Sequence, residues 1–305
     1  MNILYNKIDF EEAIEVAGLQ YIKDEPMSSH TTFRTGGPAD YFILPKTCEE
    51  LGNAIDFTDL YGVKRLILGF GSNVLILDGG FRGAVICLSK MNEISVSGDK
   101  LCAMAGARLS SLTSYALNNG LTGSEFAGGI PGSVGGAVFM NAGAYGGEIK
   151  DIILSARVLK EGKILTLSKD ELKLSYRSSS VMKDGGTVIS AEFLLKRGDV
   201  NAAREYLKEL NEKRRQKQPL NYFSAGSTFK RPEGYFAGAL IEECGLKGYE
   251  VNGACVSKKH AGFVVNKGGA ASKDILQVIK HVKDTVFKEK GVELEPEVRI
   301  IGDEA

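Results

Sequence analysis

The sequence predicts an α+β protein built from more than one lobe. Three observations carry this prediction: a helix pattern at 47–61 followed by short strand patterns, a middle region dominated by strand patterns, and a long amphipathic helix at 272–290. The chain has 305 residues, of which 43% are hydrophobic and 25% charged. It is therefore long enough to bury a large core and has the composition of an ordinary globular protein.

Composition argues against several classes of function. Basic and acidic residues number 38 each, so the bulk charge gives no sign of a nucleic-acid or membrane partner. The five cysteines are scattered and none forms a C-x-x-C pair, which disfavours a metal site and favours reduced thiols. The polar start of the chain, which includes Asn2, Asn6 and Lys7, predicts no secretory signal. We therefore expect a cytoplasmic protein that binds no metal.

The first lobe is expected over residues 1–90. Its helix at 47–61 has a capping pattern, Thr47 with Glu50, and a natural stop at Gly62. Strand patterns separated by glycine turns follow at 65–68, 74–77 and 84–88. This alternation is typical of a small α/β lobe.

The second lobe is expected over residues 91–198 and is mostly β. Strand patterns at 93–97 and 101–105 flank a Gly98-Asp99 turn, and a helix pattern at 110–119 ends at Gly120. The remaining patterns are a hairpin, 152–159 with 164–167 around Glu161-Gly162, and a strand at 187–195.

A domain boundary is expected near Gly198, which leaves residues 199–305 as a C-terminal α+β domain. A helix begins at Asp199 and stops before Pro219. Its predicted inner face consists of Ala203, Tyr206, Leu207 and Leu210. The long helix at 272–290 has Ile275, Ile279, Val282 and Val286 on its inner face. A strand at 292–301 closes the chain, with Leu294, Val298 and Ile300 on one face and Glu295, Glu297 and Arg299 on the other.

Two glycine-rich segments are the strongest candidates for a binding site. The first is 69–75, directly after a strand, and the second is 128–136. The second lies in an uncharged stretch, 126–147, which contains eight glycines and is expected to form buried loops rather than a membrane helix. Glycine lets backbone N–H groups approach a phosphate, although simple turns between strands are an equal alternative. Neither segment fits the Rossmann or P-loop pattern.

Other candidate residues have competing explanations. Ser227 lies in a small-residue turn and either faces a ligand or bonds its own backbone. Arg177, in a Ser/Tyr-rich turn, either holds a carboxylate or is simply exposed. Glu297 either serves a site or pairs with Arg299 on a solvated face. The basic residues at 213–217 either bind a diphosphate or are solvated at a helix end.

Together these residues resemble the UDP-N-acetylenolpyruvoylglucosamine reductase family, over about 31–302. The joint order and spacing of the motifs carry the resemblance. They are Arg34-Thr35-Gly36-Gly37, Gly69-Phe70-Gly71-Ser72-Asn73, Gly129-Ile130-Pro131-Gly132, Asn141-Ala142-Gly143, Tyr176-Arg177, Arg214 with Lys217-Gln218-Pro219, Ala225-Gly226-Ser227 with Phe229-Lys230, and Pro296-Glu297-Val298-Arg299.

The resemblance implies a two-lobed FAD-binding fold of the vanillyl-alcohol-oxidase/p-cresol methylhydroxylase type over 1–198 and a UDP-sugar-binding domain over 199–305. It implies noncovalent FAD, NADPH as hydride donor, and reduction of the enolpyruvyl ether of UDP-N-acetylglucosamine to UDP-N-acetylmuramate for peptidoglycan synthesis. Ser227 aligns with the proton donor, and Arg177 and Glu297 align with the residues that stabilise the developing charge. The implied FAD-binding residues are Gly69, Phe70, Gly71, Ser72, Asn73, Gly129, Ile130, Gly132, Ser133 and Gly135. The implied substrate-binding residues are Tyr145, Arg214, Lys217 and Arg299.

Two departures place the chain nearer the shorter, type II form of the family. Arg231 stands where one branch has asparagine, and only a short segment separates it from Gly245. The alternatives left open are a flavin oxidase of the same fold and a non-catalytic nucleotide-sugar-binding protein. The glycine segments contain no His or Cys for covalent FAD attachment, which favours the reductase. We also expect a monomer.

Overall fold

The computed structural model describes residues 9–304. Residues 1–8 and 305 lie outside the described range, so the polar start formed by Asn2, Asn6 and Lys7 does too. The chain folds into two compact units that are interleaved along the sequence. Unit 1 comprises Met1–Lys23, Tyr41–Phe70 and Gly83–Glu212, and unit 2 comprises Asp24–Asp40, Gly71–Arg82 and Lys213–Ala305. The functional division into 1–198 and 199–305 is a separate question and stays a prediction.

Unit 1 combines helices with an extended antiparallel sheet. Its helices are α1 (Phe10–Val16), α2 (Cys48–Leu60), α3 (Leu109–Asn118), α4 (Val134–Met140), α5 (Ile149–Ile152) and α6 (Ser180–Asp184), with 3-10 turns η3 (Leu88–Lys90) and η4 (Glu125–Ala127). Its strands are β3 (Arg65–Leu68), β6 (Ile94–Ser97), β7 (Lys100–Met104), β8 (Leu121–Thr122), β9 (Gly143–Ala144), β10 (Gly147–Glu148), β11 (Ile153–Lys160), β12 (Lys163–Ser168), β13 (Thr187–Leu194) and β14 (Lys196–Arg197).

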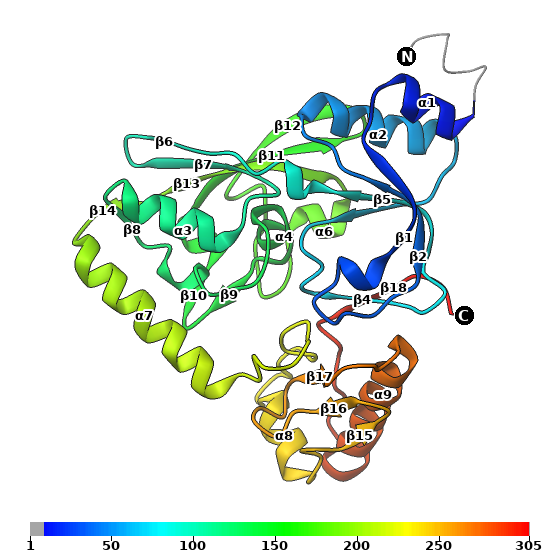
Figure 1. The fold of residues 1–305 in the computed structure, drawn as a ribbon. Helices are drawn as coiled ribbons and strands as arrows, with labels where there is room; N and C mark the ends of the chain where they lie inside the picture. The colour runs from blue at the N-terminus through cyan, green and yellow to red at the C-terminus, as the bar shows by residue number, and fades with distance from the viewer. Residues whose placement is uncertain (1–8, 305) are drawn as a thin grey trace. The chain divides into compact units, whose positions relative to one another are not determined.

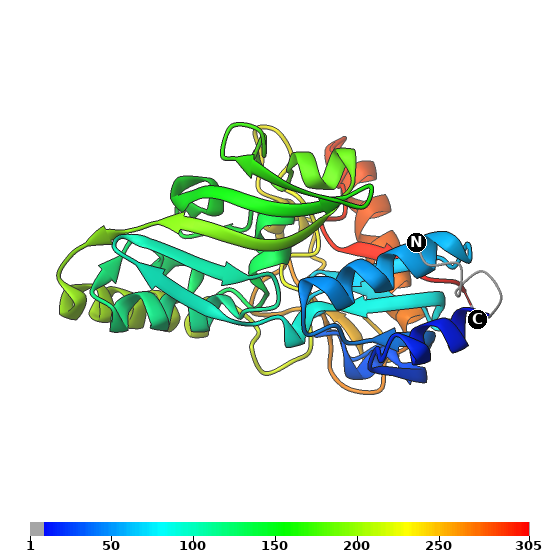
Figure 2. The ribbon, with the colours of Figure 1, turned by 90° about the horizontal axis from the view of Figure 1, so that it is seen from above.

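The main sheet of unit 1 has the order β12-β11-β13-β7-β6, and its paired strands are antiparallel (Figure 2). A second sheet has the order β1-β2-β5-β3 and includes β1 (Tyr21–Pro26), β2 (Pro38–Ile43) and β5 (Phe81–Cys87), each of which contributes residues to both units. Helix α7 (Val200–Lys217) likewise begins in unit 1 and ends in unit 2. One hydrophobic core fills unit 1, from Phe10 to Leu195.

Several helices and strands begin and end where the sequence predicts, because short-range interactions determine their ends. Helix α2 begins after Thr47, whose side chain accepts a hydrogen bond from the Glu50 N–H at 3.1 Å. It ends at Tyr61 and is followed by Gly62 at φ 64°. The predicted hairpin is β11–β12, in which Lys160 pairs with Lys163 and the turn residues Glu161 and Gly162 both have positive φ.

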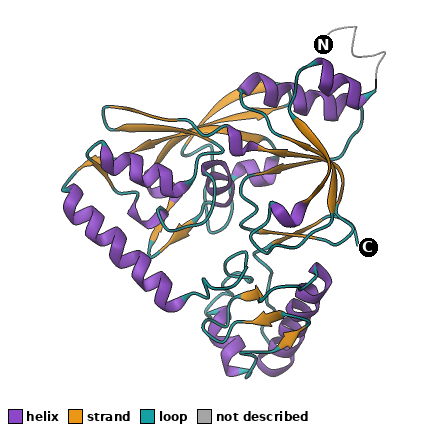
Figure 3. Ribbon diagram, viewed as in Figure 1, coloured by secondary structure: helices purple, strands orange, loops and turns teal. Residues whose placement is uncertain are grey.

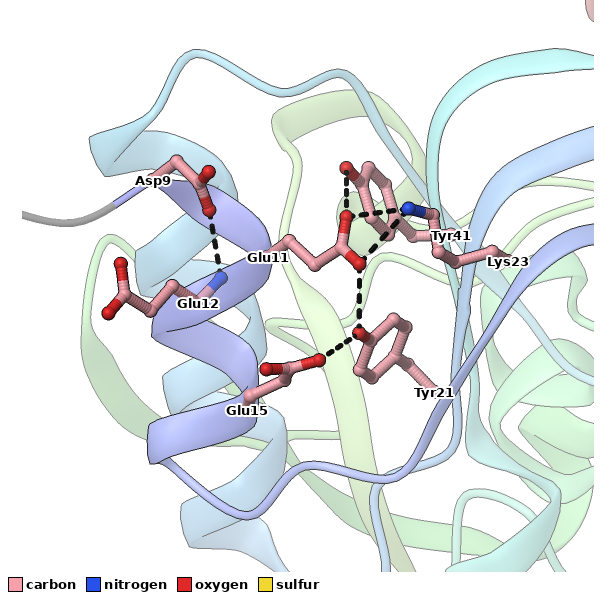
Figure 4. Close-up of polar contacts among 7 residues, drawn as sticks. All are labelled: Asp9, Glu11, Glu12, Glu15, Tyr21, Lys23 and Tyr41. Carbon is pink, nitrogen blue, oxygen red and sulfur yellow. Dashed lines mark hydrogen bonds and ion pairs between the residues drawn. The ribbon is translucent and has the colours of Figure 1, made fainter.

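A polar cluster ties α1 to the neighbouring strands of unit 1 (Figure 4). The Glu11 carboxylate accepts hydrogen bonds from Lys23 Nζ at 2.8 Å and from the phenols of Tyr21 and Tyr41 at 3.2 and 3.4 Å. The Lys23 contact is the main reason that the pKa of Glu11 lies below its ordinary value. The Tyr21 phenol also donates to Glu15 at 2.6 Å, and this bond to a carboxylate raises the pKa of Tyr21.

Unit 2 contains both helices and strands, which Figure 3 colours by type. Its elements are η2 (Met27–Ser29), β4 (Val74–Ile76), α8 (Ala237–Glu243), β15 (Glu250–Val251), β16 (Ala254–Val256), β17 (Val264–Asn266), α9 (Ser272–Lys290) and β18 (Arg299–Ile301). Strands β15, β16 and β17 form an antiparallel sheet, and β18 pairs in parallel with β4. Helix α9 packs against the three-stranded sheet, as Figure 1 also shows.

The predicted inner face of α9 is confirmed, because Ile275, Ile279, Val282 and Val286 are all buried. The residue that caps the start of this helix from outside was not predicted. Asp78 accepts the N–H groups of Ser272 at 2.8 Å and Lys273 at 3.1 Å, so a carboxylate from a distant turn caps the helix.

Three expectations need correction. The strand expected at 292–301 shrinks to β18, because only Arg299–Ile301 finds a partner strand, and Ile300 is 43% exposed rather than buried. Tyr206 is 44% exposed, so the inner face of α7 is narrower than expected. The segment 126–147 is not loop alone, since it contains α4.

Within 9–304, no helix is both long enough and apolar enough to cross a membrane. The same range holds no cluster of three or more His, Cys, Asp or Glu side chains placed to bind a metal ion.

Candidate active site

The two glycine-rich segments meet within unit 1. A Cβ added to Gly69 would lie 2.3 Å from Ser133 Oγ, so any side chain at this position would force the Ser133 hydroxyl to move. Ser133 in turn caps α4 by accepting the Gly136 N–H at 3.2 Å. Phe70 lies beneath the guanidinium of Arg108, whose Cζ is 4.2 Å from the ring centroid.

The second segment is anchored to the strand–helix connection that precedes α3. The Leu109 N–H donates to the Gly132 carbonyl at 3.1 Å, and the Gly135 N–H donates to the Ala105 carbonyl at 2.8 Å. A Cβ on Gly135 would come within 2.8 Å of the Ala105 Cβ, so this glycine is also required by close packing. Gly129 and Ile130, the other candidates in this segment, are partly exposed.

The rest of the first segment belongs to unit 2. Gly71 has φ 60°, and its carbonyl accepts the Thr32 N–H at 3.1 Å. Ser72 is partly exposed. Asn73 links this segment to the end of the chain: its Nδ2 donates to the Glu297 carbonyl at 3.3 Å, and its carbonyl accepts the Arg299 N–H at 3.1 Å. The structure therefore brings together three of the predicted site residues.

Ser227 and Glu297 are held next to one another in unit 2 through Thr228. The Thr228 carbonyl accepts the Glu297 N–H at 2.8 Å, and the Thr228 N–H donates to the Gly262 carbonyl at 2.8 Å. The Thr228 hydroxyl accepts the Val264 N–H at 2.9 Å. Thr228 is 1% exposed whereas Ser227 is exposed. A buried threonine thus presents the neighbouring serine at the surface of the unit.

Arg177 and Tyr145 both occupy turn tips in unit 1. Arg177 has φ 51° in a turn closed by reciprocal backbone hydrogen bonds between Ser175 and Ser178, at 3.0 and 3.1 Å. Tyr145, at φ 53°, lies between β9 and β10, which pair as a hairpin, and it is 38% exposed. Left-handed backbone at non-glycine residues is strained and occurs often at functional sites.

The basic residues at the end of α7 differ in exposure. Arg214 is 8% exposed and Lys217 is exposed. The alternative that these residues form a solvated helix end therefore does not hold for Arg214.

The glycine segments fit the diphosphate of a dinucleotide cofactor. Within the described residues, the backbone N–H groups of Gly69, Phe70 and Ser72 have no hydrogen-bond partner in the protein. All three residues are partly exposed, so these donors are accessible to an anion. Within unit 1, the close approach of Gly69 to Ser133 places the second glycine-rich segment beside Gly69.

Sequence analysis named Asn141 within a family motif but gave it no role, and it did not identify Thr228 as a residue that holds Ser227 and Glu297 in place. Their contacts are with residues far along the chain, which spacing within a motif does not reveal. The one available signal was the left-handed position expected for an asparagine directly after a helix, at Asn141.

Comparison with known proteins agrees with this geometry. Residues 39–168 match the family model described as FAD binding domain, and residues 218–301 match that of the UDP-N-acetylenolpyruvoylglucosamine reductase C-terminal domain. A protein of that reductase name from Clostridium perfringens strain SM101 is 53% identical over 280 residues, covering 92% of each chain. Another from Lachnoclostridium phytofermentans is 50% identical over 305 residues, covering 98% of each.

Solved structures give the same picture. The UDP-N-acetylenolpyruvylglucosamine reductase of Thermus caldophilus superposes with a TM-score of 0.80 at 33% identity, over 92% of this chain and 98% of that one. A berberine bridge enzyme variant superposes with a TM-score of 0.51 at 18% identity over 63% of this chain, which is a likeness of fold alone. The expected FAD-binding fold with a separate C-terminal domain is therefore confirmed.

Proposed function

This chain belongs to the UDP-N-acetylenolpyruvoylglucosamine reductase family, and we propose that Ser227, Arg177 and Glu297 carry out the catalytic chemistry of its reaction. The enzyme is an FAD-dependent reductase of peptidoglycan precursor synthesis that uses NADPH. It converts the enolpyruvyl ether of UDP-N-acetylglucosamine to UDP-N-acetylmuramate. Family membership decides against the two alternatives, a flavin oxidase and a non-catalytic binding protein.

The two glycine-rich segments are proposed to hold the FAD diphosphate without a covalent bond. The accessible N–H groups of Gly69, Phe70 and Ser72 and the adjacent Ser133 loop support this assignment. The chemistry that FAD supplies when bound is hydride transfer, from NADPH and then to the terminal carbon of the enolpyruvyl group. We assign FAD binding to 1–198 and substrate binding to 199–305, which the two matched ranges support.

Arg177 and Glu297 are proposed to stabilise the substrate during hydride addition. Negative charge then moves into the substrate carboxylate, and a fixed guanidinium is suited to bind it bidentately. Glu297 must be protonated, or paired so that it donates a hydrogen bond, because a bare carboxylate would repel that charge.

Ser227 is proposed to protonate the adjacent substrate carbon. The observation that carries this proposal is the Thr228 connection, which places the exposed Ser227 beside Glu297. A serine hydroxyl is a weak acid, so fixed geometry is essential to its use as a proton donor.

The substrate's remaining contacts are assigned to Tyr145, Arg214, Lys217 and Arg299. Arg214 and Lys217 lie at the end of one helix and are proposed to bind the UDP diphosphate by charge-assisted hydrogen bonds. The short segment between Arg231 and Gly245 supports the type II form.

The cellular setting follows from the chemistry. We place the enzyme in the cytoplasm, where nucleotide sugars and NADPH are available and thiols stay reduced. We also propose that it acts as a monomer without a nucleic-acid or membrane partner. Sedimentation of the FAD-loaded enzyme at micromolar concentration tests the oligomeric state.

The Ser227→Ala variant tests the central assignment. Reduction of bound FAD by NADPH requires no proton for the substrate, so its rate should stay close to the original. Reoxidation by the enolpyruvyl substrate should slow by roughly 10²–10⁴, the range for a lost general acid. Stopped-flow absorbance separates the two steps, and Ser224→Ala in the same loop is the control. Equal slowing of both steps, or of neither, would refute the role of Ser227.

A further inference from the structure

Helix α4 joins two parts of unit 1 that the proposed reaction uses. At its N-terminus, Ser133 contacts the first glycine-rich segment. At its C-terminus the chain turns through Asn141, which has φ 44° and is fully buried. Asparagine tolerates this left-handed conformation better than most residues, because its short amide can bond locally.

The Asn141 side chain uses its hydrogen bonds to tie three segments together. Its Nδ2 donates to the Glu148 carboxylate at 2.9 Å and to the Ser175 carbonyl at 3.0 Å. Its Oδ1 accepts the Lys150 N–H at 3.0 Å. Glu148 belongs to β10, in the hairpin whose tip is Tyr145, and Ser175 opens the turn that carries Arg177.

A second contact docks the Arg177 turn onto the same helix end. Ser179 Oγ donates to the Phe139 carbonyl of α4 at 2.8 Å and accepts the Met182 N–H at 3.1 Å, which caps α6. The turn is therefore held on both sides of its left-handed tip, by Asn141 before it and by Ser179 after it. Strained backbone of this kind persists only where the surroundings hold it.

We propose that Asn141 is a positioning residue for Arg177, because its amide holds the turn that carries this arginine. This inference rests on the proposed function of Arg177. Fixed geometry is what the role demands, because a misplacement of about 1 Å in a catalytic group costs roughly 10²-fold in rate.

The charges around Asn141 explain why a neutral amide is needed. Glu148 pairs with Lys150 Nζ at 2.9 Å, and the hydrogen bonds from Lys150 and Asn141 together with the charge of Arg177 hold the pKa of Glu148 below its ordinary value. Glu148 is thus an anion that needs a donor. Asparagine offers both a donor for Glu148 and an acceptor for the Lys150 N–H, whereas aspartate offers acceptors alone.

The test compares Asn141→Asp with Arg177→Ala and with the double variant, each as the FAD-loaded enzyme. Asn141→Asp keeps the size and backbone preference of asparagine but loses both donated hydrogen bonds. Reoxidation by the enolpyruvyl substrate should slow about 10²-fold, while flavin content and reduction by NADPH stay unchanged. In the double variant the rate should equal that of Arg177→Ala alone, because an arginine that is absent cannot be misplaced.

Two further variants complete the test, one as a control and one as a substitute for Asn141→Asp. Asn119→Asp changes a partly exposed asparagine that follows helix α3, and it should leave both half-reactions intact. If the buried charge prevents Asn141→Asp from folding, Asn141→Gly removes the same hydrogen bonds, and glycine accepts the left-handed backbone.

The outcomes separate this inference from the proposed function. Normal reoxidation in Arg177→Ala overturns the role of Arg177, and the inference falls with it. Slow reoxidation in Arg177→Ala but normal reoxidation in Asn141→Asp or Asn141→Gly overturns the inference alone. An additive loss in the double variant overturns it as well, since Asn141 would then act on something other than Arg177.

Discussion

Replacing Thr228 with valine should lower the stability of the protein and slow the reaction of the substrate, because both depend on hydrogen bonds made by Thr228. Valine has nearly the shape of threonine but cannot accept a hydrogen bond, so the Val264 N–H would lose the acceptor that now lies 2.9 Å away. Thr228 is 1% exposed, so water cannot substitute. A buried donor left without an acceptor costs about 1–3 kcal/mol. A loss near 2 kcal/mol corresponds to a drop in Tm of about 4–8 °C for a domain of 150–250 residues.

The same substitution should also slow the reaction, because the Thr228 carbonyl accepts the Glu297 N–H and Thr228 directly follows Ser227 in the chain. We expect Thr228→Val to slow reoxidation by the enolpyruvyl substrate about 10–100-fold, as a small displacement of two catalytic groups would. Reduction by NADPH and flavin content should not change. Stopped-flow absorbance and thermal unfolding of the same preparations measure both effects.

Thr228→Ser is the matched control. Serine keeps the acceptor and loses only a methyl group, which should lower stability by about 1 kcal/mol but leave reoxidation fast. The reasoning fails if serine and valine slow reoxidation equally, since packing rather than the hydrogen bond would then hold the site. It also fails if valine lowers Tm without slowing the reaction.

Three further outcomes are expected. Gly69→Ala should lower the flavin-to-protein ratio, because the new Cβ would lie 2.3 Å from Ser133 Oγ. The control is Gly52→Ala in α2, where there is open space for a Cβ; this variant should keep its flavin and gain about 1 kcal/mol of stability. Arg214→Ala and Lys217→Ala should each raise the substrate KM about tenfold or more with flavin content intact; an effect equal to that of Lys208→Ala on the same helix would contradict the assignment. Burial holds the pKa of the His260 imidazole below its ordinary value of 6.5. The imidazole therefore binds a proton more readily in the unfolded chain, and the free energy of unfolding should fall as the pH drops through 6.5. His260→Asn, which keeps an acceptor for the Gly262 N–H, should flatten denaturant midpoints measured from pH 7.5 to 5.5, and an unaltered slope would count against this explanation.

The sequence predicted the elements whose signals are local. Thr47 and Gly62 bound α2, Glu161-Gly162 bound the β11–β12 hairpin, and a regular stripe of buried residues marks α9. Each signal lies within a few residues of the element it sets, so no knowledge of distant partners was needed.

Elements that depend on distant partners were misjudged or missed. Helix α4 contains Gly135 and Gly136, which have poor helix propensity, and forms because Ser133 caps it and its apolar residues are buried. Strand β18 is shorter than its pattern because β4 offers partners to Arg299–Ile301 alone. The spacing of the motifs identified the candidate site residues. It did not reveal that Asn141 and Thr228 hold these residues in place, because the hydrogen bonds involved join different segments of the chain.

The pairing of β18 with β4 has a consequence for how the chain is made. The partner of Ile76 is Ile301, 225 residues later, and β4 forms a sheet with β18 alone. At about 5–20 residues per second, a ribosome needs roughly 10–45 s to cover that distance. For that time Val74, Leu75 and Ile76 leave the exit tunnel without their partner strand, and an apolar strand edge is open to other chains. All residues of unit 1 lie at or before residue 212, so they are synthesised before the partner strand of β4. A nascent chain halted before residue 299 should therefore be a target for chaperones and proteases.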